Sequence, residues 1–301
     1  MLGLMAGAAW GTTSLGSRYL AHVRGIFPPI TVFWRFGLAV PLLILAYYLW
    51  GRNGKRLEWR DVPKIIGLGA LGIFLMANFN FYATVYTTNI NSTMIVTASA
   101  VLIALIVYFM GAKVTFGQWL GIVTGLAGVG LIALAKSPTE KDLTVWQHLL
   151  GIALATGASL SWALYTVLGG GMVEKYGGLR VTVWAITAGA LMQVPVAVGS
   201  GVWQVSSGLA ASDWWVMVYL AIFPTALAFS VWFIALRYVD VTTLGMTQYV
   251  GPVISAALGW LWLGERILWQ HVAGAALIFI GLRFASIGKG VGKENEETAK
   301  T

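Results

Sequence analysis

Ten predominantly apolar stretches, each close to 20 residues long, follow one another along the chain and are separated by short polar breaks. They span residues 3–21, 28–50, 62–84, 91–111, 116–135, 146–169, 180–199, 214–237, 243–263 and 269–287. A helix of about 20 residues crosses the hydrocarbon core of a bilayer, which is about 30 Å thick. None of the stretches alternates apolar and polar positions over about ten residues, as a membrane β-strand does. The pattern therefore predicts an all-α integral membrane protein with ten transmembrane helices.

The composition excludes a soluble protein, because 58% of the 301 residues are hydrophobic and only 10% are charged. Soluble domains carry roughly 45–50% apolar and about 25% charged residues. The 19 Lys and Arg outnumber the 11 Asp and Glu, but they are scattered over the polar breaks and do not indicate a nucleic-acid-binding face. With no Cys and only three, widely separated His, the chain is expected to hold no metal and no cofactor. The expected partners are a small-molecule substrate and membrane lipid.

The basic residues also set the expected orientation, since loops rich in Lys and Arg face the cytoplasm. The densest basic cluster follows the second stretch and consists of Arg52, Lys55, Arg56, Arg60 and Lys64. Placing this side in the cytoplasm puts both termini there, in the inner (plasma) membrane. No Lys or Arg precedes the first apolar stretch, so a cleavable signal peptide is not expected.

Like residues recur at near-constant spacing between the two halves, which indicates an internal duplication. The pairs, separated by 152 or 153 positions, are Trp10 and Trp162, Asp61 and Asp213, Tyr86 and Tyr238, Gly111 and Gly264, Lys113 and Arg266, and Gly121 and Gly274. Each half carries five stretches. Because five is odd, the second copy enters the membrane from the opposite side, which is the inverted-repeat architecture of many secondary transporters. We therefore expect two five-helix repeats, residues 1–141 and 142–287, and a poorly ordered polar tail, residues 288–301.

Several short motifs resemble the drug/metabolite transporter superfamily, whose members pair two EamA-like modules. They are Ala9-Trp10-Gly11, Pro28 followed by Arg35, Ala235-Leu236-Arg237-Tyr238, Gly251-Pro252 and Gly264-Glu265-Arg266. The halves have diverged, because Ser99 stands where the second half has Pro252, Ala112 where it has Glu265, and Ala185 near the position that matches Arg35. The resemblance implies a ten-helix carrier that exports small metabolites by alternating access. Amino-acid exporters, including those for aromatic amino acids, belong to this superfamily.

No acidic residue lies in the middle of a predicted span. Glu174, Asp240 and Glu265 lie at span ends, and the others lie in loops or the tail. Ion-coupled carriers commonly place a carboxylate inside the bilayer. The sequence therefore favours a uniporter or an exchanger. An enzyme is not expected, because the only nucleotide-type match, Gly67-x-Gly69-x-x-Gly72, lies inside an apolar span. The alternatives are a nucleotide-sugar or drug exporter and, from another class, a polytopic membrane enzyme.

Polar and aromatic residues within the spans are the candidate substrate-binding residues. For each one, an interhelical hydrogen bond is the competing interpretation. As a set near mid-span in both halves, they predict a neutral, aromatic central cavity. The set consists of Trp10, Thr13, Asn78, Tyr82, Thr97, Ser99, Trp162, Tyr165, Trp184, Gln248 and Tyr249.

Arg35 is the one charge well inside a predicted span, seven residues after Pro28. It is expected either to anchor on helix-end carbonyls or to act as a gate or carboxylate contact. Pro224 and Pro252 lie far enough inside their spans to serve as hinges. Small residues four apart predict close helix packing within the bundle, with dimerisation as the rival interpretation, so a monomer is expected. These small residues are Gly3, Gly7 and Gly11, then Gly117, Gly121 and Gly125, then Gly151, Ala155 and Ser159.

Overall fold

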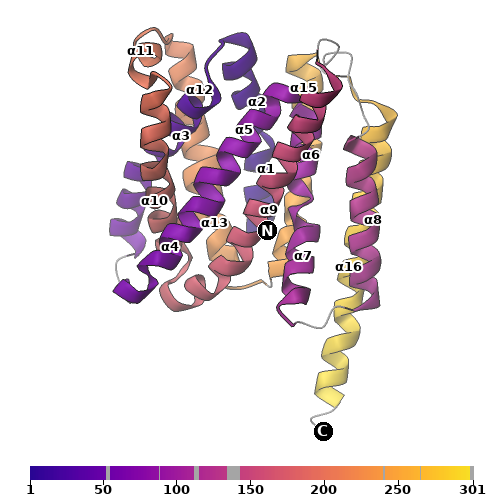
Figure 1. The fold of residues 1–301 in the computed structure, drawn as a ribbon. Coiled ribbons are helices and arrows are strands. Elements are labelled where there is room, and N and C mark those ends of the chain that lie inside the picture. Colours follow the sequence, from indigo (N-terminus) through magenta and orange to yellow (C-terminus); the bar gives the residue numbers. More distant parts are fainter. Residues whose placement is uncertain are drawn as a thin grey trace.

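The computed structural model describes residues 1–51, 55–87, 89–111, 115–133, 143–239, 241–264 and 266–298, and these ranges contain helices and turns but no strand. The helices lie side by side along one long axis (Figure 1). Six helical runs in the described part are long and apolar enough to cross a membrane: Pro28–Leu49, Trp59–Tyr86, Asn91–Phe109, Val145–Tyr176, Gly178–Gly199 and Ala211–Ala235. The prediction of an all-α bundle of membrane-spanning helices is confirmed at this level. A full set of ten crossings stays a prediction.

The first half of the chain folds into helices that are broken by short changes of helical pitch. They are α1 (Leu2–Gly11), α2 (Thr13–Arg18), η1 (Tyr19–Val23), α3 (Pro28–Ala46), η2 (Tyr47–Gly51), η3 (Trp59–Asp61), α4 (Val62–Gly69), η4 (Ala70–Leu75), α5 (Met76–Tyr86), α6 (Asn89–Thr97), α7 (Ser99–Phe109) and α8 (Phe116–Ala133). Helix α3 begins at Pro28 because proline fits the first helical turn, and the residue before it, Phe27, is extended as proline requires.

The second half contains the longest helices. They are α9 (Val145–Tyr176), α10 (Gly178–Gly199), α11 (Val202–Ser207), α12 (Ala211–Ala221), η6 (Ile222–Leu227), α13 (Ala228–Ala235), α14 (Val241–Met246), η7 (Thr247–Tyr249), α15 (Val250–Leu263) and α16 (Trp269–Thr298). A capping box between Thr144 and Gln147 starts α9. Gly177, at φ 85°, ends it and lets the chain turn directly into α10. Helix α16 extends past residue 287, and the flexible tail stays a prediction.

Two π-helical turns, η4 and η6, interrupt the third helical run of each half. Their bounds, Ala70–Leu75 and Ile222–Leu227, are separated by the same 152 residues as the paired tryptophans. A π turn breaks the regular hydrogen-bond ladder of an α-helix and is frequent at functional sites. Both interruptions border the aromatic core described below, because Gly72 of η4 abuts the Tyr165 ring and Pro224 of η6 contacts Trp10.

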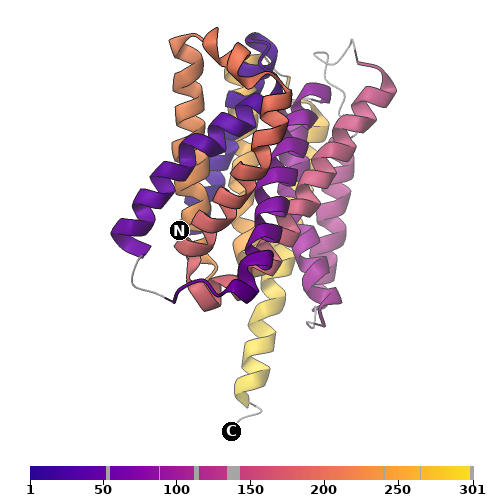
Figure 2. The ribbon, with the colours of Figure 1, turned by 60° about the vertical axis from the view of Figure 1, so that its left-hand side comes forward.

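Contacts between helix ends fix the directions in which several helices run. The end of α5 lies beside η1, where the His22 Nε2 atom is 2.8 Å from the Thr84 carbonyl oxygen. The start of α12 lies at the same end, because Arg24, just after η1, pairs with Asp213. Tyr176, the last residue of α9, contacts Asp61 at the start of α4. Runs α4–α5 and α12–α13 therefore point in opposite directions (Figures 1 and 2).

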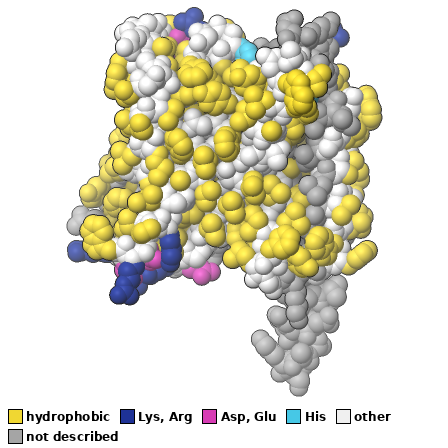
Figure 3. Space-filling model, viewed as in Figure 1, with side chains coloured by type: hydrophobic (Ala, Val, Ile, Leu, Met, Phe, Trp, Pro, Cys, Tyr) yellow, Lys and Arg dark blue, Asp and Glu magenta, His cyan; other side chains and the backbone are white. Residues whose placement is uncertain are grey.

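Glycines allow the close helix contacts that the small-residue spacing predicts. A Cβ atom at Gly11 of α1 would lie 2.6 Å from the Gly251 carbonyl oxygen of α15. A Cβ atom at Gly151 of α9 would lie 2.9 Å from the Tyr86 carbonyl oxygen of α5. These glycines pack helices of one chain against each other. Along the side of the bundle the surface is mostly hydrophobic, and charged side chains gather at its two ends (Figure 3).

Candidate functional site

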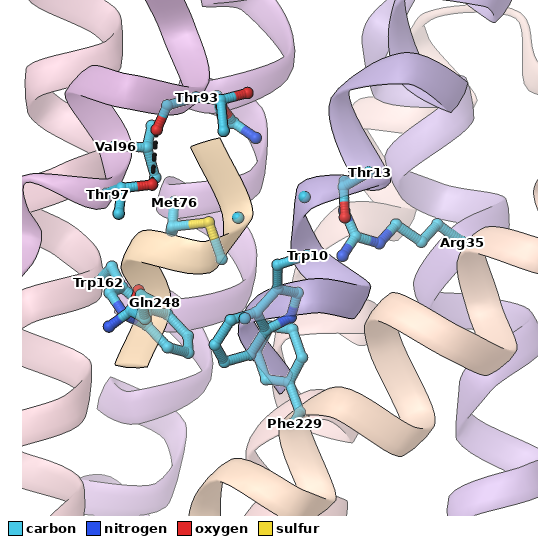
Figure 4. Close-up of a pocket in the computed structure, with 14 residues that line it drawn as sticks. Trp10, Thr13, Arg35, Met76, Thr93, Val96, Thr97, Trp162, Phe229 and Gln248 are labelled. Carbon is cyan, nitrogen blue, oxygen red and sulfur yellow. Dashed lines mark hydrogen bonds between the residues drawn. The ribbon is translucent and has the colours of Figure 1, made fainter. Parts of the chain in front are cut away.

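A cavity lies in the middle of the bundle, between helices of both halves (Figure 4). The positions open to the centre of a water molecule fill about 70 Å³. One water needs roughly 10–15 Å³ by that measure, so the space holds several. The lining residues are Gly7, Trp10, Gly11, Thr13, Arg35, Met76, Asn80, Thr93, Val96, Thr97, Trp162, Phe229, Gln248 and Gly251. None of these residues is acidic.

Aromatic rings from three helices form one wall of the cavity. The ring centroids of Trp10 on α1 and Trp162 on α9 are 4.9 Å apart, and each lies 5.5 Å from Phe229 on α13. Trp232, one helical turn after Phe229, packs behind both tryptophans at 5.1 and 5.6 Å. Edge-to-face arrangements of this kind are favourable for aromatic pairs. The wall joins the two tryptophans that the 152-residue spacing singles out.

The π turn η6 supplies a backbone acceptor to two residues of the cavity lining, Trp10 and Arg35. Pro224 has no N–H group, so the Leu220 carbonyl loses its usual helical donor and accepts the Thr225 hydroxyl instead, at 2.7 Å. The Ala228 N–H bonds to the carbonyls of residues 223 and 225, which leaves the Pro224 carbonyl free for side chains. Trp10 Nε1 donates to that carbonyl at 2.9 Å. Local helix geometry thus creates an acceptor in the bundle interior.

Arg35 on α3 binds to the same π turn. Its Nε atom donates to the Thr225 hydroxyl at 2.7 Å, and Nη2 donates to the Pro224 carbonyl at 3.2 Å. The residue is only 3% exposed, and its guanidinium lies 5.1 and 5.7 Å from the ring centroids of Phe36 and Phe81. The expected anchor to carbonyl groups is present, and the side chain also lines the cavity. In the part of the chain that the structure describes, no carboxylate pairs with it.

Three buried polar atoms of the lining have no hydrogen-bond partner in the described structure: Thr13 Oγ1, Trp162 Nε1 and Gln248 Nε2. The residues are 5%, 3% and 7% exposed. Buried polar groups are almost always hydrogen-bonded, so each exception calls for an explanation. Because the three residues line one cavity, a molecule bound beside them is the natural partner for these atoms. In Figure 4 the Thr13 hydroxyl and the Arg35 guanidinium point toward each other, and Trp162 and Gln248 lie on the other side of Trp10.

The structure brings only part of the sequence-predicted set to this cavity. Trp10, Thr13, Thr97, Trp162 and Gln248 line it, together with Arg35. The side chain of Tyr249 and the side chains of several neighbouring residues lie outside the described ones.

Four other predicted residues are engaged or buried elsewhere. Asn78 exchanges hydrogen bonds with Gln193 on α10, at 2.7 Å from its Nδ2 atom. Tyr82 packs edge-on against Phe27, with centroids 5.7 Å apart. Tyr165 is fully buried against Phe233, and Ser99 is fully buried without lining the cavity. Asn78 thus makes the interhelical hydrogen bond that the competing interpretation describes.

Trp184 and Pro252 also lie away from the central cavity. Trp184 is 41% exposed and packs beside Tyr47, next to a surface pocket near one end of the bundle. Placing it in the central cavity is wrong, because that part of α10 faces outward. Pro252 is buried and lines an apolar groove between α15 and α16. Pro224, the other predicted hinge, contacts the cavity lining through its carbonyl.

Sequence reasoning missed several lining residues, among them Met76, Thr93 and Phe229. Met76 and Phe229 carry no signal that separates them from ordinary core residues. Thr93 belongs to the polar run Asn91-Ser92-Thr93 at the start of a span, and this cluster was an available signal. Its hydroxyl lies 3.0 Å from the Ser255 hydroxyl on α15.

Ionic contacts lie at both ends of the bundle. At one end Lys175 on α9 contacts Glu58 and Asp61 at 2.7 and 2.6 Å. At the other end Arg24 makes two hydrogen bonds to the fully buried Asp213 carboxylate, at 2.8 and 2.9 Å. Hydrogen bonds from Lys175 and then Lys55 hold the pKa of the exposed Glu58 carboxyl below its usual range. The hydrogen bond to Asp213 raises the pKa of Arg24. Each ionic contact joins one half of the chain to the other.

Comparison with known proteins places this architecture in a family. The model of the EamA-like transporter family matches residues 1–134 and 149–287. An uncharacterized transporter of Archaeoglobus fulgidus is 30% identical over 254 residues, which cover 83% of this chain and 84% of that protein. A second uncharacterized transporter of the same organism is 25% identical over 280 residues, or 91% and 93% of the two chains.

A probable terminal-alkyne amino-acid exporter of Streptantibioticus cattleyicolor is 24% identical and covers 81% of this chain and 80% of its own length. A solved crystal structure with 20% sequence identity covers 96% of this chain and 97% of that chain, with a TM-score of 0.71. At that identity the likeness concerns the fold alone. The chain belongs to the EamA-like transporter family and is a multi-pass membrane protein.

Proposed function

We propose that the protein exports small amphipathic metabolites, with amino acids, including aromatic ones, as the preferred cargo, through the central cavity. The observation that carries this proposal is the cavity itself, with an aromatic wall and three buried polar atoms that have no partner in the described structure. Rings supply apolar contact area, and the unpaired polar atoms supply orientation, as in other small-molecule sites. The amino-acid exporter among the relatives supports the choice of cargo.

The proposed architecture is ten transmembrane helices in two inverted five-helix repeats, residues 1–141 and 142–287. The two segments matched by the family model lie one in each proposed repeat. The opposite directions of α4–α5 and α12–α13, and the 152-residue spacing of η4 and η6, support it further. The central cavity then lies between the repeats, where such transporters bind substrate.

Alternating access is proposed to use the ionic contacts at the two ends as gates. Asp61 and Asp213 occupy equivalent positions in the sequence repeat, and each binds a cation from the other half. Breaking one contact while the other holds opens the cavity to one side only. Pro224 is proposed as a hinge between α12 and α13, since the π turn at this point already lacks regular ladder hydrogen bonds.

Transport as a uniporter or exchanger, without an ion gradient, is supported by the chemistry of the lining. Its described residues include no carboxylate that could carry a coupling proton or sodium ion. We further propose a monomer in the inner (plasma) membrane with both termini in the cytoplasm. The basic cluster near Lys55 and Lys64 lies at the same end as Lys175, which agrees with one Lys- and Arg-rich cytoplasmic face.

Flux measurements on purified protein in liposomes test the proposal. Liposomes preloaded with labelled phenylalanine should release it faster with the protein than without it, and external unlabelled phenylalanine should accelerate exchange. An imposed pH gradient alone should drive no accumulation. Flux of nucleotide sugars or cationic drugs in place of amino acids would favour the alternative cargo. A double variant, Trp10→Ala with Trp162→Ala, is the matched control because it removes the wall that both halves contribute.

A further inference from the structure

We infer that the cavity recognises its cargo by the carboxylate, which Arg35 and Thr13 bind, and that a cargo amine contributes little. This inference rests on the proposed function, because it assigns the part of the cargo that the central cavity selects. The substrate class it names is an organic carboxylate with an apolar or aromatic body. Amino acids are one member of this class.

The cavity wall carries a positive charge. Arginine stays protonated in proteins, so the 3%-exposed Arg35 puts a full positive charge at the cavity wall. Its two hydrogen bonds in the described structure go to neutral acceptors, the Thr225 hydroxyl and the Pro224 carbonyl. A guanidinium offers five N–H donors in a planar fork that matches a carboxylate. The remaining donors are therefore available to an anion that enters the cavity.

The unpaired polar groups of the lining are mostly hydrogen-bond donors. Trp162 Nε1 and Gln248 Nε2 are donors only, and the Thr13 hydroxyl can donate as well as accept. All three are buried without partners in the described structure. A cavity with surplus donors and a cation is complementary to a ligand rich in acceptors, of which a carboxylate is the most common. Figure 4 places Thr13 and Arg35 together on one side, as a carboxylate with two oxygens requires.

The cavity offers few groups that could bind an amine of the cargo. An ammonium group needs acceptors, and the described residues of the lining include no Asp or Glu. Asn80 Oδ1 already accepts a hydrogen bond from Ser92 at 3.1 Å, and the hydroxyl groups of the lining are neutral and therefore weaker acceptors for a cation than a carboxylate. A positive group would also be repelled by Arg35. The cavity therefore favours a carboxylate without an amine at least as much as a zwitterion, and it disfavours a cation.

Three ligands with the same ring and chain length separate these contributions: L-phenylalanine, 3-phenylpropionate and phenethylamine. Their binding is measured by thermal stabilisation of the purified protein and by inhibition of phenylalanine exchange in liposomes. The two carboxylates should bind within about tenfold of each other, and the amine at least a hundredfold more weakly. Arg35→Gln should weaken the binding of both carboxylates at least tenfold and reduce the discrimination against the amine. Arg35→Lys keeps the positive charge and should therefore retain part of this discrimination.

Two further variants keep the test decisive if Arg35→Gln fails to fold. Thr13→Val keeps the side-chain shape and loses a hydroxyl that has no partner in the described structure, so it should fold normally and bind both carboxylates at least threefold more weakly. Arg180→Gln is the matched control, because Arg180 is a buried arginine at one end of the bundle that bonds to the Lys55 carbonyl and does not line the cavity. It should leave the ratio of carboxylate to amine binding unchanged.

The outcomes distinguish this inference from the proposed function. Equal binding of amine and carboxylates, or unchanged discrimination in both Arg35→Gln and Thr13→Val, overturns the inference even if phenylalanine is transported. Absence of flux together with Arg35-dependent stabilisation by 3-phenylpropionate overturns amino-acid export and supports the carboxylate site. Absence of both flux and stabilisation by either carboxylate overturns both.

Discussion

The two cavity tryptophans should respond differently to the same substitution, because their indole N–H groups have different partners. Trp10 Nε1 donates to the Pro224 carbonyl at 2.9 Å, whereas Trp162 Nε1 is buried without a partner in the described structure. Changing either residue to Phe removes the N–H and the same ring atoms. The loss of ring volume is therefore similar in Trp10→Phe and Trp162→Phe, and the difference between the variants isolates the N–H group.

The expected magnitudes follow from these partners. Trp10→Phe removes a native hydrogen bond, which contributes about 1 kcal/mol to the free energy of unfolding. Trp162→Phe instead removes an unsatisfied buried donor, whose desolvation costs at least about 1 kcal/mol. The two variants should differ by about 2 kcal/mol, or roughly 4 °C in melting temperature. If bound cargo accepts a neutral hydrogen bond from Trp162, its loss should raise KM about fivefold, since about 1 kcal/mol corresponds to that factor.

Thermal unfolding of both purified variants, combined with KM for phenylalanine exchange in liposomes, checks the reasoning. Trp10→Phe should melt lower with KM changed less than twofold. Trp162→Phe should melt higher than Trp10→Phe and show the raised KM. Equal melting temperatures and equal KM values would refute the assignment of one N–H group to the fold and the other to the cargo.

Three other predictions concern the packing and the two ends. Gly11→Val would place a side chain against a backbone carbonyl oxygen that lies 2.6 Å from its Cβ position, so it should destabilise the fold by about 1–3 kcal/mol. Gly37→Val is the control, because no atom lies within 4 Å of its Cβ position, and it should change the stability little. Thermal unfolding of both variants measures the difference. Asp213→Asn should open one end of the bundle, so a cysteine introduced at Thr97 in this cysteine-free chain should react faster with an impermeant thiol reagent from that side only. The lowered pKa of Glu58 means that its ionic contacts stabilise the fold above about pH 4.3 and are lost as pH falls through the lower folded-state value. Unfolding of the parent and of Glu58→Gln should therefore differ at neutral pH and converge in acid; a constant difference would contradict this.

The near-constant spacing of like residues was the strongest guide that the sequence offered to the site. A spacing of 152 residues singles out Trp10 and Trp162, and the structure places their rings 4.9 Å apart at the cavity. Arg35 was identifiable because a lone charge inside an apolar span demands partners. Its actual partners, Pro224 and Thr225, lie about 190 positions away in sequence, and only the packing of α3 against η6 reveals them.

Other site residues could not be chosen from the sequence, because neighbouring candidates are chemically alike. Asn78 and Asn80 lie two apart on α5, about 200° around the helix, so only one of them faces the cavity. The structure selects Asn80, and Asn78 bonds to Gln193. Trp184 likewise has the composition of a cavity residue, yet its side of α10 is exposed. The rotation of each helix about its axis decides these cases, and an apolar span without a strong polar face does not encode it clearly.

The π turn at Ile222–Leu227 has a consequence for the permitted length of the chain. A π turn holds more residues than the α-helical turn that it replaces. Deleting one residue there would remove the extra residue of the π turn and give a backbone N–H donor to the Pro224 carbonyl, which now accepts from Trp10 and Arg35. It would also rotate all of α13 by about 100° relative to α12 and carry Phe229 away from the tryptophans. The number of residues in this short stretch therefore determines the shape of the chamber as firmly as their identity does.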